Sequence, residues 1–503
     1  MMQHLIILPV VLPLATGAML LLNRQRNTRI RRNVGLLATA LLVVIAIALV
    51  VKAASGEVDY YALGDWQPPF GIILVLDRLS ALMVLLTSLL ALACVIFASA
   101  GEDDQGSNFH GLFQLQLMGI NGAFLTGDLF NLFVFFEVLL LASYALLVHG
   151  GGKPRIQASV HYVVLNLANS SLFLIAVGVL YGATGTLNMA DMAMRIGAIE
   201  PERTGLVSAA ALLLLVVFGV KAAILPLYFW LPRAYAAAPA PVAALFAIMT
   251  KVGVYAILRV YHLIFGEQAG PLAALEQPWV WWLSLATLAA AAIGVLAARD
   301  LRLMVSYLIL VSVGTLLAGI GIRSPESVSA LLYYLIHTTL VTGGLFLLAE
   351  MIGQERGKAG TRLVKGKPLR HANLLGLLFF LGAITVAGIP PLSGALGKVL
   401  LLSSTPEALR FWFWPILLSS GLCALIALSR AGSTLFWRSN EGETQDIVLS
   451  RRQLIGVSML LGASPVIVAL SGPIHAYTTA TAEQLAQPRI LIEAILIDSG
   501  EKP

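Results

Sequence analysis

Five ionisable side chains lie inside long apolar segments of the sequence, where a charged group needs a reason to remain. They comprise one glutamate, three lysines and one histidine, each on a different segment: Glu137, Lys221, Lys251, His337 and Lys398. A charged side chain near the centre of a bilayer costs about 2.5 kcal/mol or more, even on the lenient insertion scale. Such residues are typical of ion paths, so we expect these five to form a connected polar line.

The chemistry that this set supports is proton transfer. Burial and a neighbouring carboxylate act in opposite directions on the protonation of an amine. If the distance between Lys221 and Glu137 changes, the lysine holds and releases a proton in turn. The plainer explanation of Glu137 and of Lys221 is that each is half of a structural ion pair that joins two helices. For His337, the plainer explanation is a neutral core histidine beside Tyr333 and Tyr334.

Five further polar or aromatic residues in the apolar segments have structural explanations. Asp128 stands at the start of a segment and is expected to cap a helix N-terminus. Arg259 and Glu350 lie near segment ends and are expected to snorkel toward the interface. Tyr144 and Tyr255 share predicted helix faces with two of the ionisable residues, and aromatic packing accounts for both.

The composition predicts an all-α polytopic membrane protein with a single membrane domain, residues 1–503. The chain is 58% hydrophobic and only 12% charged, and its mean hydropathy is +0.88. A soluble fold could not bury so much apolar surface. A bilayer core of about 30 Å needs about 20 apolar residues per helix, and the sequence offers roughly fourteen such stretches. The net charge is +6, but the Lys and Arg residues lie mostly in short loops, so we expect no nucleic-acid partner.

Helices are the only spanning structures that satisfy the backbone in lipid at these lengths. Residues 3–110 hold helices 1–3, 111–265 a first five-helix unit, 279–436 a second such unit, and 437–503 the last helix and a tail. The predicted helices are 3–22, 34–53, 77–100, 111–126, 129–148, 158–181, 207–230, 239–265, 279–298, 303–321, 327–352, 372–402, 412–436 and 453–470. The tail, residues 472–503, is polar and amphipathic, and the sequence assigns it no contact.

Two of these helices are predicted to be broken. The seventh contains Pro226, and the twelfth contains Pro390 and Pro391 within the stretch GIPPLSG. Proline removes a backbone donor and clashes with the preceding turn, so each site marks a kink or an interruption. Paired broken helices in the two halves of a transporter indicate an inverted repeat around an ion path. We therefore expect helices 4–8 and 9–13 to form the two repeats.

The distribution of Lys and Arg predicts that both termini face the outer side of the membrane. The loops after odd-numbered helices hold most of these residues, from Arg24 and Arg26 to a dense run between Arg356 and Arg370. The loops after even-numbered helices hold few, mainly Arg195, Arg203, Arg323 and Arg410. The loop of residues 101–110 follows an odd-numbered helix and is acidic, but acidic residues weigh little in this rule.

Three stretches resemble a known family. Residues 127–147, GDLFNLFVFFEVLLLASYALL, look like the fifth helix of the D-type subunits of the Mrp-type multisubunit cation/proton antiporters. Residues 219–235, GVKAAILPLYFWLPRAY, resemble a core that this family shares with the antiporter-like subunits of respiratory complex I. The GIPPLSG stretch matches the family's broken twelfth helix. The similarity extends over nearly the whole chain in the same order.

The resemblance implies a fourteen-helix fold with two inverted five-helix repeats. By position, Glu137 and Lys221 would form a glutamate–lysine pair, Lys251 and His337 a central relay, and Lys398 the terminal group. The implied activity is exchange of protons for Na⁺ or K⁺ across a bacterial inner membrane. The implied partners are the lipid bilayer and the other Mrp subunits, of the A, B, C, E, F and G types.

Two other functions stay open at the level of sequence. The chain resembles, less closely, the proton-pumping membrane subunit of complex I or of a membrane-bound hydrogenase, in which the redox centres lie elsewhere. The stretch around Glu137 favours the antiporter. A purely structural scaffold is disfavoured by the ionisable groups at membrane depth. We find no nucleotide loop, flavin motif or metal cluster, so we expect no catalytic residue, cofactor or metal ligand.

Overall fold

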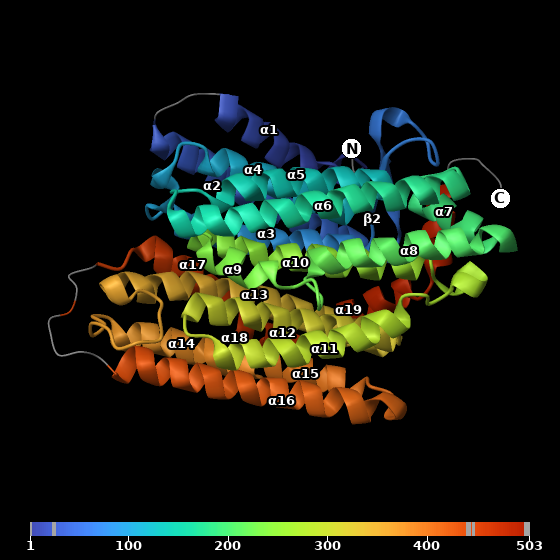
Figure 1. Ribbon diagram of the computed structural model, residues 1–503. Helices are drawn as coiled ribbons and strands as arrows, with labels where there is room; N and C mark the ends of the chain where they lie inside the picture. The colour runs from blue at the N-terminus through green and yellow to red at the C-terminus, as the bar shows by residue number, and fades with distance from the viewer. Residues whose placement is uncertain (1–2, 23–26, 439–443, 445–447, 497–503) are drawn as a thin grey trace.

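The computed structural model describes residues 3–22, 27–438, 444 and 448–496. Long helices run side by side along one direction (Figure 1). Within the described residues, eleven helices are long and apolar enough to cross a membrane, and three shorter apolar helices accompany them. This confirms the predicted all-α membrane fold. Arg24, Arg26 and the last seven residues of the predicted tail lie outside the described residues.

The N-terminal part contains three helices and a small hairpin that the sequence did not predict. The helices are α1 (Leu8–Leu22), α2 (Thr28–Ala53) and α3 (Arg78–Ala98). Strands β1 (Asp59–Ala62) and β2 (Ile73–Leu76) pair antiparallel between α2 and α3. Asp77 follows β2 directly and closes a capping box with Ser80 at the start of α3. The hairpin and α3 are therefore joined by a rigid corner.

The first predicted repeat region contains a broken helix at the expected place. Its helices are α4 (Phe109–Leu125), α5 (Leu129–Leu147), α6 (Lys153–Thr184), α7 (Met189–Gly197), α8 (Pro201–Ala222), α9 (Trp230–Ala237) and α10 (Ala240–Leu263). Helix α8 ends where Ala223 takes a left-handed conformation with φ +62°, and helical structure resumes only at α9. Thr287 accepts a hydrogen bond from the freed Leu225 amide at 2.8 Å. A neighbouring helix thus satisfies the opened backbone, as lipid requires.

The second predicted repeat region is interrupted in a similar way. Its helices are α11 (Gln277–Ala297), α12 (Leu301–Ile322), α13 (Pro325–Glu355), α14 (Ala372–Ala387), α15 (Ser393–Ser403) and α16 (Glu407–Gly432). Helix α14 ends at Gly388, whose φ of +83° suits a residue without a Cβ. Helix α15 begins five residues later, after the two prolines. Both predicted interruptions are therefore confirmed, while the inverted-repeat relation stays a prediction.

The C-terminal part folds back along the bundle. It contains α17 (Arg451–Leu461), α18 (Ala463–Ala469), α19 (Ser471–Leu485) and α20 (Pro488–Leu496). Helix α19 packs on α13, and the short amphipathic helix α20 packs on α7. The tail that the sequence left without a contact is thus part of the same structure as far as Leu496.

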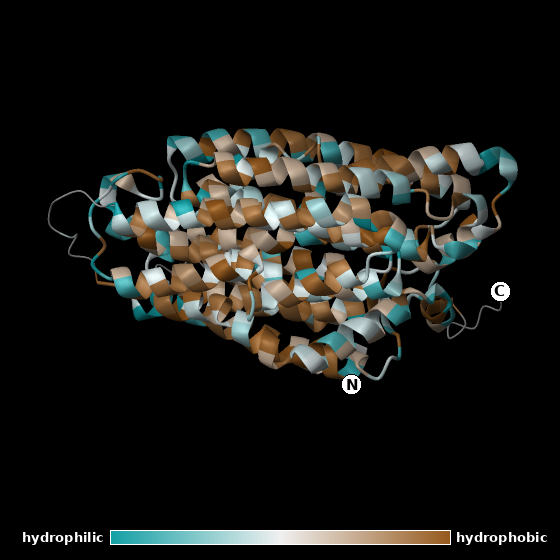
Figure 2. Cartoon of the chain, turned by 90° about the horizontal axis from the view of Figure 1, so that it is seen from below, coloured by the Kyte–Doolittle hydropathy of each residue, from teal (hydrophilic) through white to brown (hydrophobic). Residues whose placement is uncertain are grey.

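Helices α10 and α13 lie at the centre of the bundle. In the most apolar 18-residue stretch of each helix, all residues of α10 and 94% of those of α13 are buried, whereas 39% are buried in α2 and in α6. Apolar residues form a broad band across the helices, with hydrophilic residues toward the ends (Figure 2). Polar groups on α10 and α13 therefore sit in the interior, away from lipid.

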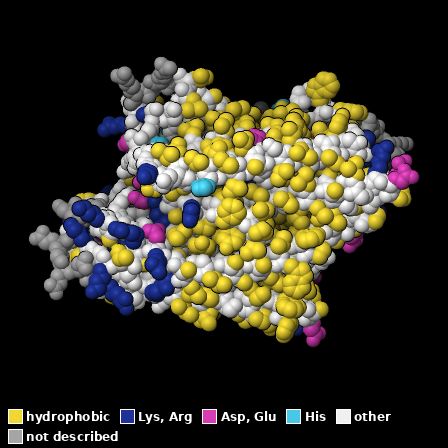
Figure 3. All heavy atoms as spheres, viewed as in Figure 1, with side chains coloured by type: hydrophobic (Ala, Val, Ile, Leu, Met, Phe, Trp, Pro, Cys, Tyr) yellow, Lys and Arg dark blue, Asp and Glu magenta, His cyan; other side chains and the backbone are white. Residues whose placement is uncertain are grey.

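Charge is distributed unevenly between the two ends of the bundle. On the face shown in Figure 3, Lys and Arg side chains gather at one end, whereas α7, on which the C-terminal helix α20 packs, lies toward the other (Figure 1). Arg32 and His110 both contact Asp103, with atoms 2.7 and 2.9 Å apart. Burial alone would raise the pKa of Asp103, but hydrogen bonds from His110 and Arg32 lower it to about 2. This contact places the acidic loop of residues 101–110 at the same end as the first turns of α2.

Candidate functional site

Glu137 and Lys221 are bridged by two polar side chains of α6. The Glu137 carboxylate, half-buried on α5, accepts a hydrogen bond from the Ser170 hydroxyl. The amine of Lys221, buried at the end of α8, donates to Asn166 Oδ1 at 2.9 Å. Ser170 Oγ also lies 2.9 Å from the backbone oxygen of Asn166. Glu137 and Lys221 make no direct ion pair in the described part of the chain, so α6 supplies the connection between them.

A small cavity lies beside Lys221. It has a volume of about 10 Å³, close to the space for one water, and Asn166 and Met249 line it with the lysine. Helix α10 comes very close here, since a Cβ on Gly253 would stand 2.4 Å from the amide nitrogen of Ala222. The cavity is therefore lined by both Lys221 and α10, whose backbone packs directly against the end of α8.

Lys251 is completely buried at the middle of α10. Its amine donates to the Ser312 hydroxyl of α12 at 3.0 Å. Ser312 in turn donates to the carbonyl of Ile309 at 2.7 Å, within its own helix. Lys251 makes no ion pair among the residues that the structure describes, so a neutral hydroxyl is its hydrogen-bond partner.

His337 belongs to a buried cluster of hydroxyl groups at the break between α14 and α15. Its Nδ1 lies 2.8 Å from Ser393 Oγ, and Ser393 Oγ lies 2.8 Å from Ser464 Oγ of α18. The ring of Tyr334 lies 5.5 Å from that of His337, centroid to centroid. Helix α15 comes close to His337, because a Cβ on Gly394 would meet the imidazole at 3.1 Å. The first residues of α15 thus fix one side of the imidazole.

Lys398 points back into the same break from α15. Its amine donates to the carbonyls of Val386 and Ala387 at 3.2 and 2.8 Å. These carbonyls end α14 and lack helical partners. A cation is favoured at the C-terminal end of a helix dipole. Lys398 therefore satisfies the interrupted helix at the same break that holds His337.

The five predicted residues fall into three groups: Glu137 with Lys221, Lys251, and His337 with Lys398. No direct hydrogen bond joins one group to another within the described residues. Sequence reasoning missed the connecting residues Asn166 and Ser170. Their signal was a polar cluster, Asn166, Asn169, Ser170 and Ser171, inside an otherwise apolar stretch of α6.

The structure tests the explanations given to the neighbouring residues. Asp128 caps α5 as predicted, accepting from the Asn131 amide at 2.7 Å. The expected snorkelling of Arg259 is wrong, because Arg259 is buried and contacts Asp77 at 2.5 Å. Glu350 is partly exposed and lies 3.6 Å from Arg302. Tyr144 packs edge-on against an aromatic ring, as does Tyr255.

Comparisons with known sequences match nearly all of the chain. The family described as "NADH:quinone oxidoreductase/Mrp antiporter, TM" matches residues 126–423, which include all five predicted site residues. A protein of Rhizobium meliloti (strain 1021), named as the probable D subunit of a K(+)/H(+) antiporter, is 42% identical over 98% of each chain. The D subunit of a Na(+)/H(+) antiporter of Bacillus subtilis (strain 168) is 38% identical over 98% of this chain and 100% of that protein.

Solved structures show the same fold. A chain of the Mrp complex from Dietzia sp. DQ12-45-1b has a TM-score of 0.87 at 28% identity, covering 98% of this chain and 99% of that one. A chain of an archaeal membrane-bound sulfane sulfur reductase has a TM-score of 0.88 at 26% identity, covering 98% and 100%. Together with the two antiporter relatives, these matches show that the chain belongs to the NADH:quinone oxidoreductase/Mrp antiporter transmembrane family, among the D-type antiporter subunits.

Proposed function

We propose that this chain is the proton-translocating subunit of a hetero-oligomeric antiporter that exchanges protons for Na⁺ or K⁺ across a bacterial inner membrane. The relatives named as D subunits of Na(+)/H(+) and K(+)/H(+) antiporters support this function. Subunits of the A, B, C, E, F and G types would complete the complex. Both termini would face the outer side, which the Lys- and Arg-rich end of the bundle supports.

The observation that carries the proposal is the burial of three lysine amines without ion-pair partners. Lys221, Lys251 and Lys398 donate to an amide oxygen, a hydroxyl and two backbone carbonyls, respectively. Within the described residues, none of these amines contacts a carboxylate. A permanent charge at this depth is costly, and a structural role would favour a paired one. Amines that alternate between charged and neutral forms suit a proton relay.

Within this proposal, the three groups act in sequence. Glu137 and Lys221 form the first site, with Asn166 and Ser170 carrying the interaction between them. Lys251 and His337 form the central relay, and Lys398 exchanges the proton at the broken helix. The cavity beside Lys221 supports this order, because it has room for a water on the side toward α10.

Cation-dependent proton flux tests the proposed function directly. Everted vesicles from an antiporter-deficient strain would carry either the complete gene cluster or the cluster without this chain. Addition of Na⁺ or K⁺ is expected to dissipate an imposed proton gradient only with the complete cluster. If neither preparation responds to either cation, the antiporter function is wrong.

The alternative is a proton-pumping subunit of a respiratory complex. It draws support from the fold shared with a chain of the sulfane sulfur reductase, which is described as a respiratory membrane complex. The fold also matches a chain of complex I from Thermus thermophilus, at 24% identity and a TM-score of 0.79. In the vesicle assay this alternative predicts proton pumping that depends on an electron donor and acceptor, and no response to Na⁺ or K⁺.

Replacement of Asn166 is expected to lower the proton flux measurably, but less than replacement of the lysines. The Asn166→Ala variant removes the acceptor of the Lys221 amine, and we expect flux to fall about three- to tenfold, the effect of roughly 1 kcal/mol. The matched control is Asn169→Ala. This residue is also buried on α6, but its amide donates to the Val217 carbonyl, and within the described residues it makes no hydrogen bond to Glu137 or Lys221. Equal flux in the two variants would remove Asn166 from the proposed site.

A further inference from the structure

A second series of polar residues extends from Lys251 along α10. Tyr255 and Arg259 follow Lys251 at intervals of four residues, so the three side chains lie on one face of the helix. All three are buried, although this face lies in the interior of an apolar bundle. The series leads from the middle of α10 toward its C-terminal end, where α20 packs.

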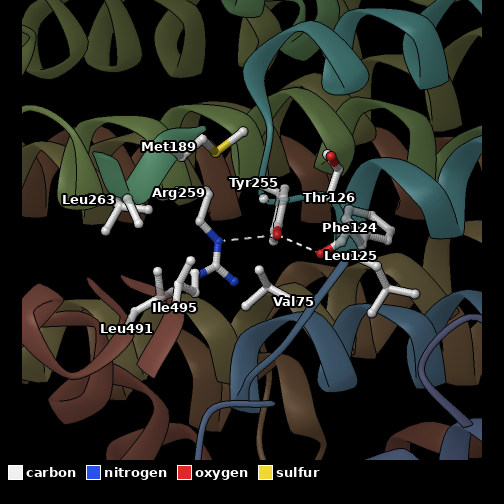
Figure 4. Close-up of a pocket in the computed structure, with 12 residues that line it drawn as sticks. Val75, Phe124, Leu125, Thr126, Met189, Tyr255, Arg259, Leu263, Leu491 and Ile495 are labelled. Carbon is white, nitrogen blue, oxygen red and sulfur yellow. Dashed lines mark hydrogen bonds between the residues drawn. The ribbon is translucent and has the colours of Figure 1, made fainter. Parts of the chain in front are cut away.

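Hydrogen bonds connect the outer part of this series. The Tyr255 hydroxyl donates to the carbonyl of Phe124 at 2.6 Å, and Arg259 Nε donates to the Tyr255 hydroxyl at 3.2 Å (Figure 4). The two terminal nitrogens of Arg259 donate to the Asp77 carboxylate at 2.5 and 2.8 Å. Polar contacts thus run without a break from Tyr255 to the corner between β2 and α3.

Two small cavities flank Arg259. One, of about 10 Å³, is lined by Val75, Thr126, Tyr255 and Leu491 among others (Figure 4). The other, of about 20 Å³, is lined by Asp77, Arg259, His262 and Gln484 among others. Each has space for about one water with polar partners. Water can therefore complete a hydrogen-bonded path on either side of the guanidinium group.

Helix α20 closes both cavities. Leu491 lines both of them, and Ile495 lines the smaller one. Leu491, Ile492 and Ile495 are buried, whereas Ile490 on the same helix is 39% exposed. The nine residues of α20 thus provide an apolar cover over a buried ion pair.

The competing explanation is that Asp77 and Arg259 form a purely structural ion pair that joins α3 to α10. Buried ion pairs are often no more stabilising than apolar residues of similar size. A structural ion pair also needs no cavities beside it, and it needs no hydrogen bond to Tyr255, one helical turn from Lys251. These features distinguish an access route from a mere ion pair.

We infer that Tyr255, Arg259 and Asp77 form a second, gated access route between Lys251 and one membrane face, with α20 as its cover. The inference rests on the proposed function, since it gives the relay lysine a connection to water. Arg259 does not itself carry the proton. It holds the waters and Tyr255 in place, and movement of α20 admits solvent along the face of α10.

Water access to position 251 tests the inference without any transport measurement. The complete complex would carry Lys251→Cys, with Cys94 and Cys423 of this chain replaced by alanine. A small methanethiosulfonate reagent would be applied to everted and right-side-out vesicles, with a thiol scavenger in the lumen. Modification of this chain would be followed by mass spectrometry. The variants compared are Leu491→Ser, the gentler Leu491→Ala, and the matched control Ile490→Ser on the exposed face of α20.

Modification of the introduced thiol at position 251 is expected to rise about tenfold or more in both Leu491 variants, from one side of the membrane only. The Ile490→Ser control is expected to stay at the level of unaltered α20. If the thiol stays unreactive in every variant while the complex assembles, the Asp77–Arg259 pair is only structural and the proposed access route is wrong. Equal modification in all variants would show that α20 is not the cover. Failure of the proposed function would appear separately, as absent cation-dependent flux in the unmodified complex.

Discussion

Replacing Lys221 by alanine is expected to abolish cation-dependent proton flux in vesicles that carry the complete gene cluster. The Lys221 amine donates to Asn166 Oδ1, and in the proposed relay its loss removes the proton carrier that α6 connects to Glu137. We expect a decrease of at least about tenfold, corresponding to more than about 1.4 kcal/mol in the barrier. The measurement is the initial rate at which Na⁺ or K⁺ dissipates an imposed proton gradient.

The control for this prediction is Lys367→Ala. Lys367 is an exposed lysine in the loop between α13 and α14, so its replacement changes net charge equally without touching the buried groups. Both variants must be present in the membrane at the level of the unaltered chain. Undiminished flux in an assembled Lys221→Ala complex would remove this lysine from the proton path.

The sequence predicted the framework of the fold well because lipid leaves few choices. A continuous apolar stretch in a bilayer must be helical, since each unpaired backbone group is costly there. Each of the fourteen predicted ranges therefore overlaps a helix. The break near Pro226 was visible for a similar reason, because proline cannot continue the backbone ladder. The β1–β2 hairpin was missed, since two strands of four residues give little periodic signal.

The sequence predicted the five ionisable residues on separate apolar helices, but it did not predict their contacts, and their roles stay a prediction. Position along a helix shows that Lys221 is at membrane depth, and it does not show which side chain the amine meets. That partner, Asn166, lies 55 residues away on α6. Pairings between distant helices depend on packing that one sequence does not reveal, so the side chains of α6 that lie between Lys221 and Glu137 could not be predicted.

Arg259 shows where a general rule was overridden. Arginine near a helix end usually reaches the interface along its apolar stem. Here the corner after β2 places Asp77 against α10, and α20 covers both residues. The rule failed because it considers one helix in lipid, whereas the end of α10 is enclosed by protein. The unpredicted hairpin and tail are the elements that enclose it.

Lys251→Met separates a relay lysine from a structural one. Methionine keeps the length and flexibility of the side chain and removes the amine. Ser312 keeps its hydrogen bond to the Ile309 carbonyl, so its buried hydroxyl is not left without a partner. We expect the thermal unfolding midpoint of the complex to stay the same or to rise, because an unpaired buried charge is costly. Flux is expected to fall about tenfold or more in the vesicle assay.

If Lys251 is a relay residue, Lys251→Met must lower the flux without lowering the unfolding midpoint. A lysine that only joined α10 to α12 would contribute through its hydrogen bond to Ser312, and Ser312→Ala would then lower the unfolding midpoint as much as Lys251→Met does. Flux would follow stability in both variants. In a relay, Ser312→Ala keeps the amine and retains part of the flux, whereas Lys251→Met loses it in a complex that is at least as stable. Unchanged flux in Lys251→Met would therefore contradict the relay directly, since α10 carries no other lysine amine.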